Sequence, residues 1–146
     1  MKRIVLFLVA VLLLLPMKSG QAARGDLIDP AKARDSIRIS TGQQFTVAFD
    51  QRGDRLVNPR RVQSAQKRSV VTLNFFVERS KSPEMRVLVV TNFYPRILRY
   101  RAAARTGTQR EFLETNMIPI HPNIPSYEGW LDPFVELLLF DFQIMK

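Results

Sequence analysis

The chain has 146 residues, of which 22 are lysine or arginine and 13 are aspartate or glutamate, so its formal net charge is +9 at neutral pH. It contains no cysteine, which excludes disulfides, thiol catalysis and cysteine-ligated metal sites. Its single histidine excludes a histidine-rich metal site. We therefore predict a basic protein that needs neither a metal nor another cofactor.

The N-terminus has the pattern of a signal peptide. A basic start precedes an unbroken apolar run of twelve residues from Ile4 to Leu15, which Pro16 ends. A membrane-spanning helix needs about 20 such residues, whereas Gly20-Gln21-Ala22 is the small-x-small pattern that signal peptidase reads. We predict a signal peptide over residues 1–22, cleavage near Ala22, and export to the periplasm or the medium.

The remainder is predicted to be a flexible lead-in over residues 23–36 and one β-sandwich domain over residues 37–146. The lead-in is polar and contains Pro30. From there on, apolar residues recur with a period of two, which indicates strands. The predicted strands cover residues 45–49, 56–57, 70–78, 85–93, 96–104 and 134–144, with shorter segments at 37–39 and 112–117.

The last of these stretches, residues 134–144 (FVELLLFDFQI), is apolar on most of both faces and is expected to be the strand around which the others assemble. Two connections can be anticipated. Gln51 to Asp54 contains Gly53 and predicts a hairpin tip. Pro119, Pro122 and Pro125 fall three apart, the polyproline II repeat, and predict an extended crossover between two edges of the domain.

About seven short strands without a convincing amphipathic helix predict an all-β fold. The favoured architecture is an antiparallel β-sandwich of immunoglobulin-like kind, and a small β-barrel is the alternative. Exposed sheet edges often add a strand from a partner. The sequence leaves open which edge is free, with residues 37–40 and 96–104 as the two candidates.

Arginine is the best-supported functional feature of the sequence. Arg99 and Arg101 alternate with apolar residues of one predicted strand, and Arg96 and Arg105 flank them. The planar guanidinium fork suits phosphate and carboxylate groups. These four arginines are predicted to bind an anionic envelope component or a protein partner. The opposing interpretation is that outward arginines only keep edge strands from aggregating.

His121, Tyr127 and Trp130 form a second candidate region. The simplest interpretation of Tyr127 and Trp130 is that they are core residues, because large rings dominate burial. The alternative is that they line an apolar pocket between the sheets. His121 could act as a general base beside Glu114, Glu128 or Asp132. Without a nucleophile motif such as G-x-S-x-G, however, the sequence does not favour catalysis.

These patterns predict an exported, non-catalytic binding module of the bacterial envelope that uses its basic face and its sheet edges. The expected partner is an envelope protein or an anionic envelope component, such as lipopolysaccharide, lipid headgroups or wall polymer, and not nucleic acid. A small-molecule carrier with an aromatic-lined pocket and a small hydrolase using His121 are the alternatives. The sequence does not indicate an oligomeric state.

Overall fold

The computed structural model describes residues 25–63, 68–80 and 82–146, so the predicted signal peptide lies outside the described residues. The described part of the chain contains ten strands and no helix, and therefore no helix long and apolar enough to cross a membrane. The strands are β1 (Leu27–Ile28), β2 (Ile37–Ser40), β3 (Gln43–Arg52), β4 (Arg55–Val62), β5 (Val70–Glu78), β6 (Met85–Asn92), β7 (Leu98–Thr106), β8 (Phe112–Thr115), β9 (Pro125–Trp130) and β10 (Phe134–Ile144).

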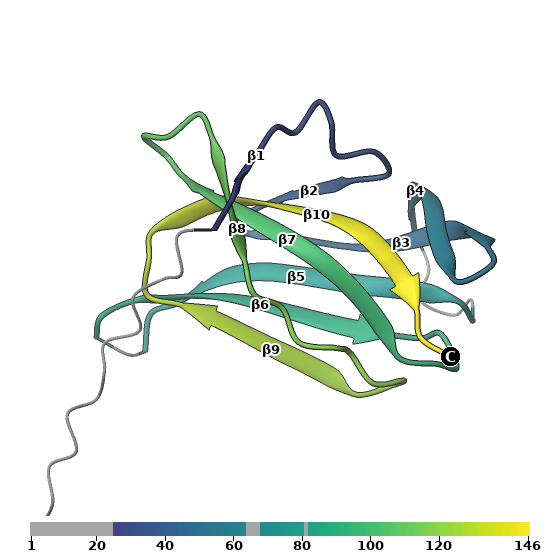
Figure 1. Cartoon of the computed structure of the whole chain (residues 1–146). Coiled ribbons are helices and arrows are strands. Elements are labelled where there is room, and N and C mark those ends of the chain that lie inside the picture. The colour runs from purple at the N-terminus through teal and green to yellow at the C-terminus, as the bar shows by residue number, and fades with distance from the viewer. Residues whose placement is uncertain (1–24, 64–67, 81) are drawn as a thin grey trace, which may run out of the picture.

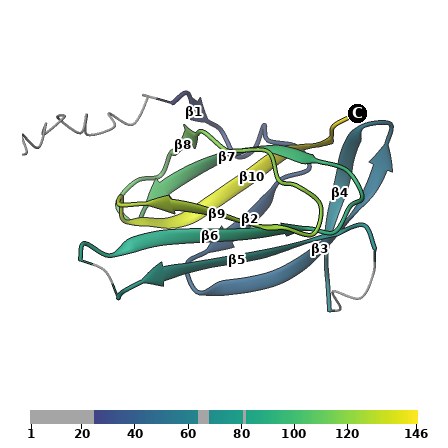
Figure 2. The same ribbon diagram turned by 90° about the horizontal axis from the view of Figure 1, so that it is seen from below.

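The strands pair antiparallel in the order β1-β8-β7-β10-β4-β3-β5-β6-β9, and β2 pairs with β10 beside this path. The sheet folds over where β10 meets β4, which gives two facing layers (Figures 1 and 2). We call the layer of β1, β8, β7, β10 and β2 sheet I, and the layer of β4, β3, β5, β6 and β9 sheet II. The predicted all-β antiparallel sandwich is confirmed.

Strand β10 occupies the position expected of the last apolar stretch, and its bounds agree with the prediction. It pairs with β7 along one edge. On its other edge it pairs first with β2, through Glu136 to Leu139, and then with β4, through Gln143 opposite Arg55. One strand thus links both layers. It is apolar on both faces because one face packs in the main core and the other in a smaller cluster with Ala103 and Phe112.

The main core lies between the two sheets. Phe142 of β10 stacks on Tyr100 of β7 with ring centroids 5.5 Å apart, and it contacts Phe49 of sheet II at 4.8 Å. Leu137 and Leu139 are fully buried on the same side of β10. Burial of each such side chain contributes about 1.5–3 kcal/mol, so the facing aromatic and aliphatic residues hold the two layers together.

The structure differs from the sequence-based prediction in three places. The count of about seven strands is too low, because β1 and β9 are strands in segments predicted as lead-in and crossover end. Strand β4 continues through Pro59 to Val62, so Pro59 does not end the pairing but marks an edge, the alternative prediction, since β4 pairs only with β3 there. Finally, β7 lies between β10 and β8, which pairs with Ala102 to Ala104, and Leu98 bridges to Ile120, so residues 96–104 are not a free sheet edge along their whole length.

The crossover predicted from the prolines connects β8 of sheet I with β9 of sheet II. Ile120 within it is fully buried and exchanges backbone hydrogen bonds with Leu98 at 2.8 and 3.0 Å. Pro122 bridges to Asn92, whose carbonyl oxygen accepts a hydrogen bond from Asn123 N at 2.7 Å. The crossover therefore runs along one side of the sandwich, between the ends of β7 and β6.

Asn92 fixes this arrangement with its side chain. It is fully buried, and it is the one buried polar residue of the described chain. Its amide nitrogen Nδ2 donates to the carbonyl oxygens of Arg96 at 2.8 Å and Ile120 at 3.1 Å, and its Oδ1 accepts from Tyr94 N at 2.9 Å. One amide group thus joins the end of β6, the β6–β7 turn and the crossover.

We expect Asn92→Ala to lower the free energy of unfolding by about 2–3 kcal/mol, because it leaves the buried Tyr94 N–H and the Arg96 carbonyl oxygen without their partner. It also removes one of the two hydrogen bonds that the Ile120 carbonyl oxygen accepts. Asn74→Ala is the matched control, since Asn74 is only partly buried on β5 and its side chain makes none of the described hydrogen bonds. Urea unfolding followed by Trp130 fluorescence measures both. An equal loss in the two variants would contradict this role of Asn92.

Candidate functional site

Strand β7 places three of the four predicted arginines on the outer face of sheet I. Leu98, Tyr100 and Ala102 point into the core, so Arg99, Arg101 and Arg105 point away from it. Arg96 lies in the turn before β7 and is exposed. The structure thus gathers Arg99, Arg101 and Arg105 on one face, with Arg96 in the turn just before the same strand. The surroundings of the four arginines differ.

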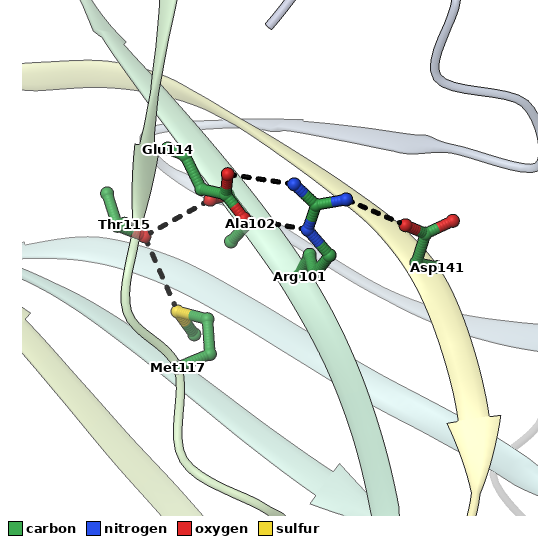
Figure 3. Close-up of polar contacts among 6 residues, drawn as sticks. All are labelled: Arg101, Ala102, Glu114, Thr115, Met117 and Asp141. Atoms are coloured by element: carbon green, nitrogen blue, oxygen red, sulfur yellow. Dashed lines mark hydrogen bonds and ion pairs between the residues drawn. The ribbon is translucent and has the colours of Figure 1, made fainter. Parts of the chain in front are cut away.

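Arg101 is held by carboxylates from both neighbouring strands. Its guanidinium donates two hydrogen bonds to Glu114 of β8, at 2.7 and 2.8 Å, and one to Asp141 of β10, at 3.1 Å (Figure 3). These hydrogen bonds raise the pKa of Arg101 and lower the pKa of Glu114. The positive charge of Arg101 is therefore already balanced within the protein.

Asp141 reaches Arg101 because β10 is irregular at this point. The register with β7 shifts between Phe140 and Gln143, and Asp141 adopts a positive φ of 53°. Aspartate tolerates this left-handed conformation better than most residues do. The bulge turns the Asp141 carboxylate onto Arg101, a common use of such irregularities in sheets.

Arg105 is also paired. Its Nε donates to Glu136 of β10 at 2.6 Å, and the two residues face each other in the strand register. Its guanidinium also lies over the Phe112 ring, 5.7 Å from the centroid. Arg105 is thus fixed by an ion pair and an aromatic contact.

A small apolar cluster fills the middle of this outer face. Ala103, Phe112, Leu138 and Phe140 are buried there although they point away from the main core. Ile28 and Ala33 of the predicted lead-in pack on them, and β1 pairs with β8 at the edge. Residues 25–36 therefore lie over part of the outer face of sheet I, where arginines ring the apolar cluster.

Arg96 and Arg99 have no such partners. Both are exposed, and within the described chain no carboxylate pairs with either of them. Opposite Arg99 in the register stands Gln143, a neutral residue. Anion binding by the predicted arginine face would therefore depend on Arg96 and Arg99 more than on Arg101 and Arg105.

The three residues of the predicted pocket point in different directions. His121 is exposed in the crossover, between Ile120 and Pro122. Tyr127 and Trp130 stand on opposite faces of β9: Tyr127 is 68% exposed, whereas Trp130 packs edge-on against Phe75 and Phe134, with centroids 6.5 and 6.1 Å away. The structure does not bring the three side chains together, and Trp130 closes one end of the core.

Glu128 is a functional candidate that the sequence named only as a neighbour of His121. It points from β9 toward the interior, where its carboxylate accepts a hydrogen bond from Ile118 N at 3.2 Å. Burial raises the pKa of Glu128. Burial also raises the pKa of Tyr100, whose hydroxyl has no hydrogen-bond partner, and the nearby Glu128 carboxylate raises it further.

The free edges of the sheet are not equivalent. On β2, Arg61 donates to the Arg38 carbonyl oxygen at 3.4 Å and the Gln43 side chain accepts from Ser40 N at 2.9 Å. On β4, Asn58 N donates a hydrogen bond to Asp35 Oδ1 at 2.8 Å, and Pro59 has no N–H to donate. Side chains therefore block both edges to a further strand, and β1 has only two residues.

Strand β9 differs, because it pairs only with β6 and no other described strand pairs with its second edge. It does begin with Pro125, and the Glu128 carboxylate accepts a hydrogen bond from Ile118 N of the crossover. Exposed apolar side chains gather in and beside β9, whereas an exposed strand edge is normally protected by charges, prolines or covering segments. The large apolar residues exposed at this place are Ile118, Ile124, Tyr127 and Leu131, each at least 55% exposed.

Comparison of the chain with protein-family models, with curated proteins and with solved structures gives no match. Within the described residues, no group of three or more histidine, cysteine or acidic side chains could hold a metal ion. The functional argument therefore rests on the two surfaces above, the charged outer face of sheet I and the open edge of β9.

We expect Glu114→Gln to lower the free energy of unfolding at pH 7 by about 0.5–1 kcal/mol, the range of partly exposed ion pairs. The pKa of Glu114 is lowered in the fold, so its contribution is present above its ordinary value of 4.5 and is lost as the pH falls through the folded pKa. Urea unfolding at pH 7 and pH 3 should show a smaller difference at pH 3, where protonation of Glu114 begins to remove its contribution. Glu111→Gln, an exposed position outside the described ion pairs, should change neither value.

Proposed function

We propose that this chain is an exported, non-catalytic binding module of the bacterial envelope, and that it captures an extended segment of an envelope protein on the open edge of β9. The observation that carries this proposal is the contrast between the edges. Side chains block β2 and β4, whereas the outer edge of β9 has no strand partner and is flanked by exposed apolar residues. Strand addition supplies affinity through backbone hydrogen bonds and selectivity through alternate side chains.

The face next to this edge supports a protein partner. Across sheet II, Gln44, Asn74, Val89 and Tyr127 stand opposite one another in register, and Thr46, Thr72, Thr91 and Pro125 form the neighbouring row. None of these residues is charged, in a chain where 24% of residues are. An added strand would extend an uncharged surface, so we expect its outward side chains to be apolar or neutral.

The arginine face of sheet I is the second surface of the proposed module. The sequence suggests an anionic envelope component as its ligand, and the ion pairs of Arg101 and Arg105 leave Arg96 and Arg99 to contact it. The predicted signal peptide supports export and a periplasmic or secreted location. An aromatic-lined carrier site is less favoured, because Trp130 packs against Phe75 and Phe134.

Site-specific photocrosslinking in cells tests the β9 edge. A photoreactive residue at Leu131 should yield an adduct with an envelope protein, whereas the same residue at Leu27, equally exposed but on the opposite margin of the sheet, should not. The adduct at Leu131 should be lost in Tyr127→Lys, because a lysine beside an open strand opposes strand addition. Leu27→Lys is the control and should leave the adduct intact.

Three results would refute this use of the edge: no adduct at Leu131, equal adducts at both positions, or an adduct that survives Tyr127→Lys. An adduct with the mass of two copies of this chain would also refute it. In that case the occupant of the edge would be a second copy and not an envelope protein.

A further inference from the structure

The sheet register brings together four residues from three distant parts of the sequence. Arg52 stands opposite Arg55 across the β3–β4 turn, Arg55 opposite Gln143 of β10, and Gln143 opposite Arg99 of β7. Residues directly opposite in a sheet share one face. We call this line of Arg52, Arg55, Gln143 and Arg99 the arginine row. It crosses four strands at the end of the sandwich where β10 finishes.

The row is positive and almost uncompensated. No carboxylate of the described chain forms an ion pair with Arg52, Arg55 or Arg99. Asp141 beside the row is held by Arg101. Asp50 is held by Arg60 at 2.8 Å, and hydrogen bonds from Asn58 and Arg60 lower its pKa. Asp54 lies in the turn itself and forms none of the described ion pairs, so the row contains three arginines and no carboxylate.

Strands β10 and β7 also contain an arginine whose charge is balanced by a carboxylate on the facing strand. Between β10 and β7, Glu136 stands opposite Arg105 and forms an ion pair with it at 2.6 Å, whereas Gln143 stands opposite Arg99. Like charges in neighbouring positions, as with Arg52 and Arg55, destabilise a sheet. A glutamate at position 143 would relieve this repulsion, yet the residue there is neutral and can donate hydrogen bonds through its amide.

We propose that the arginine row binds the phosphate groups of a linear polyanion, a proposal that rests on the binding function proposed for the basic face and names its ligand. Guanidinium groups match phosphate oxygens two at a time. Neighbouring strands are about 4.8 Å apart, so the row spans roughly 14 Å. That length suits a chain with repeated charges better than a single phosphate, which would engage only one or two of the arginines.

Long-chain polyphosphate is the probe, and its binding to the purified protein is measured by titration at several salt concentrations. The decisive variant is Gln143→Glu, which gives Arg55 and Arg99 an internal partner. We expect its affinity to fall by about tenfold at low salt, and the slope of log affinity against log salt to shrink by roughly two, because two phosphate contacts are lost. Gln44→Glu, an exposed glutamine of sheet II, adds the same charge and should bind as the unchanged protein does.

Arg55→Ala provides a second variant, with Arg79→Ala as its control, since Arg79 is 78% exposed and lies at the far end of β5. Thermal unfolding separates binding from folding. We expect Gln143→Glu to unfold at the same temperature as the unchanged protein or higher, because it adds an ion pair. Weaker polyphosphate binding together with unchanged stability therefore supports the row as a binding site.

Several results would overturn the proposal. Equal losses in Gln143→Glu and Gln44→Glu would mean that overall charge, and not the row, attracts the polymer. If inorganic phosphate displaced polyphosphate when both are present at the same concentration of phosphate groups, an extended ligand would be ruled out. Row-dependent binding to phosphatidylglycerol vesicles with no binding of polyphosphate would assign the row to a lipid surface. Tyr127→Lys should leave polyphosphate binding unchanged, so failure at the row and failure at the β9 edge are separate results.

Discussion

The hydrogen bonds of the Asn92 side chain are the constraint on which the arrangement of both surfaces depends. They tie the end of β6 to the β6–β7 turn and to the crossover that leads into β9. Because the amide is fully buried, a lost bond could not be replaced by water without opening the core. The same bonds hold the turn that leads into β7, the strand that carries Arg99. One polar residue thus fixes the connections to the outer strand of sheet II and to the strand of the unpaired arginine of sheet I.

The outer face of sheet I shows how the same residue type serves two purposes. Arg101 and Arg105 are surrounded by Glu114, Asp141 and Glu136, and they lie over the rings of Phe140 and Phe112. These two arginines lie at the border of the small outer cluster, and Ile28 and Ala33 of residues 25–36 also pack against that cluster. The arginines at the other end of the face have neither carboxylates nor rings. Partners in the fold, and not exposure alone, separate a structural arginine from one available to a ligand.

The sequence predicts much of the fold, because period-two alternation follows directly from the alternating faces of a strand. It fails at β9, where Pro125 and Gly129 remove the usual strand signal and pairing with β6 supplies the order instead. Arg99 could be found in the sequence, since it alternates with core residues. Arg55 and Gln143 could not, because their place beside Arg99 results from register between strands that are far apart in the chain. The contact of Arg101 with Asp141 depends on the bulge at Asp141, which likewise has no local signal in the sequence.

The two surfaces should respond to salt in opposite ways, and this follows from their composition. Contacts at the arginine row would be exposed ion pairs, which weaken as the Debye length falls from about 10 Å at 0.1 M to about 3 Å at 1 M salt. Strand addition at β9 would rest on backbone hydrogen bonds and on Ile124, Tyr127 and Leu131, which carry no charge. Salt leaves such contacts intact or strengthens them. A module that holds a protein by its edge could therefore release a polyanion from its basic face without losing that protein, because different forces act at the two places.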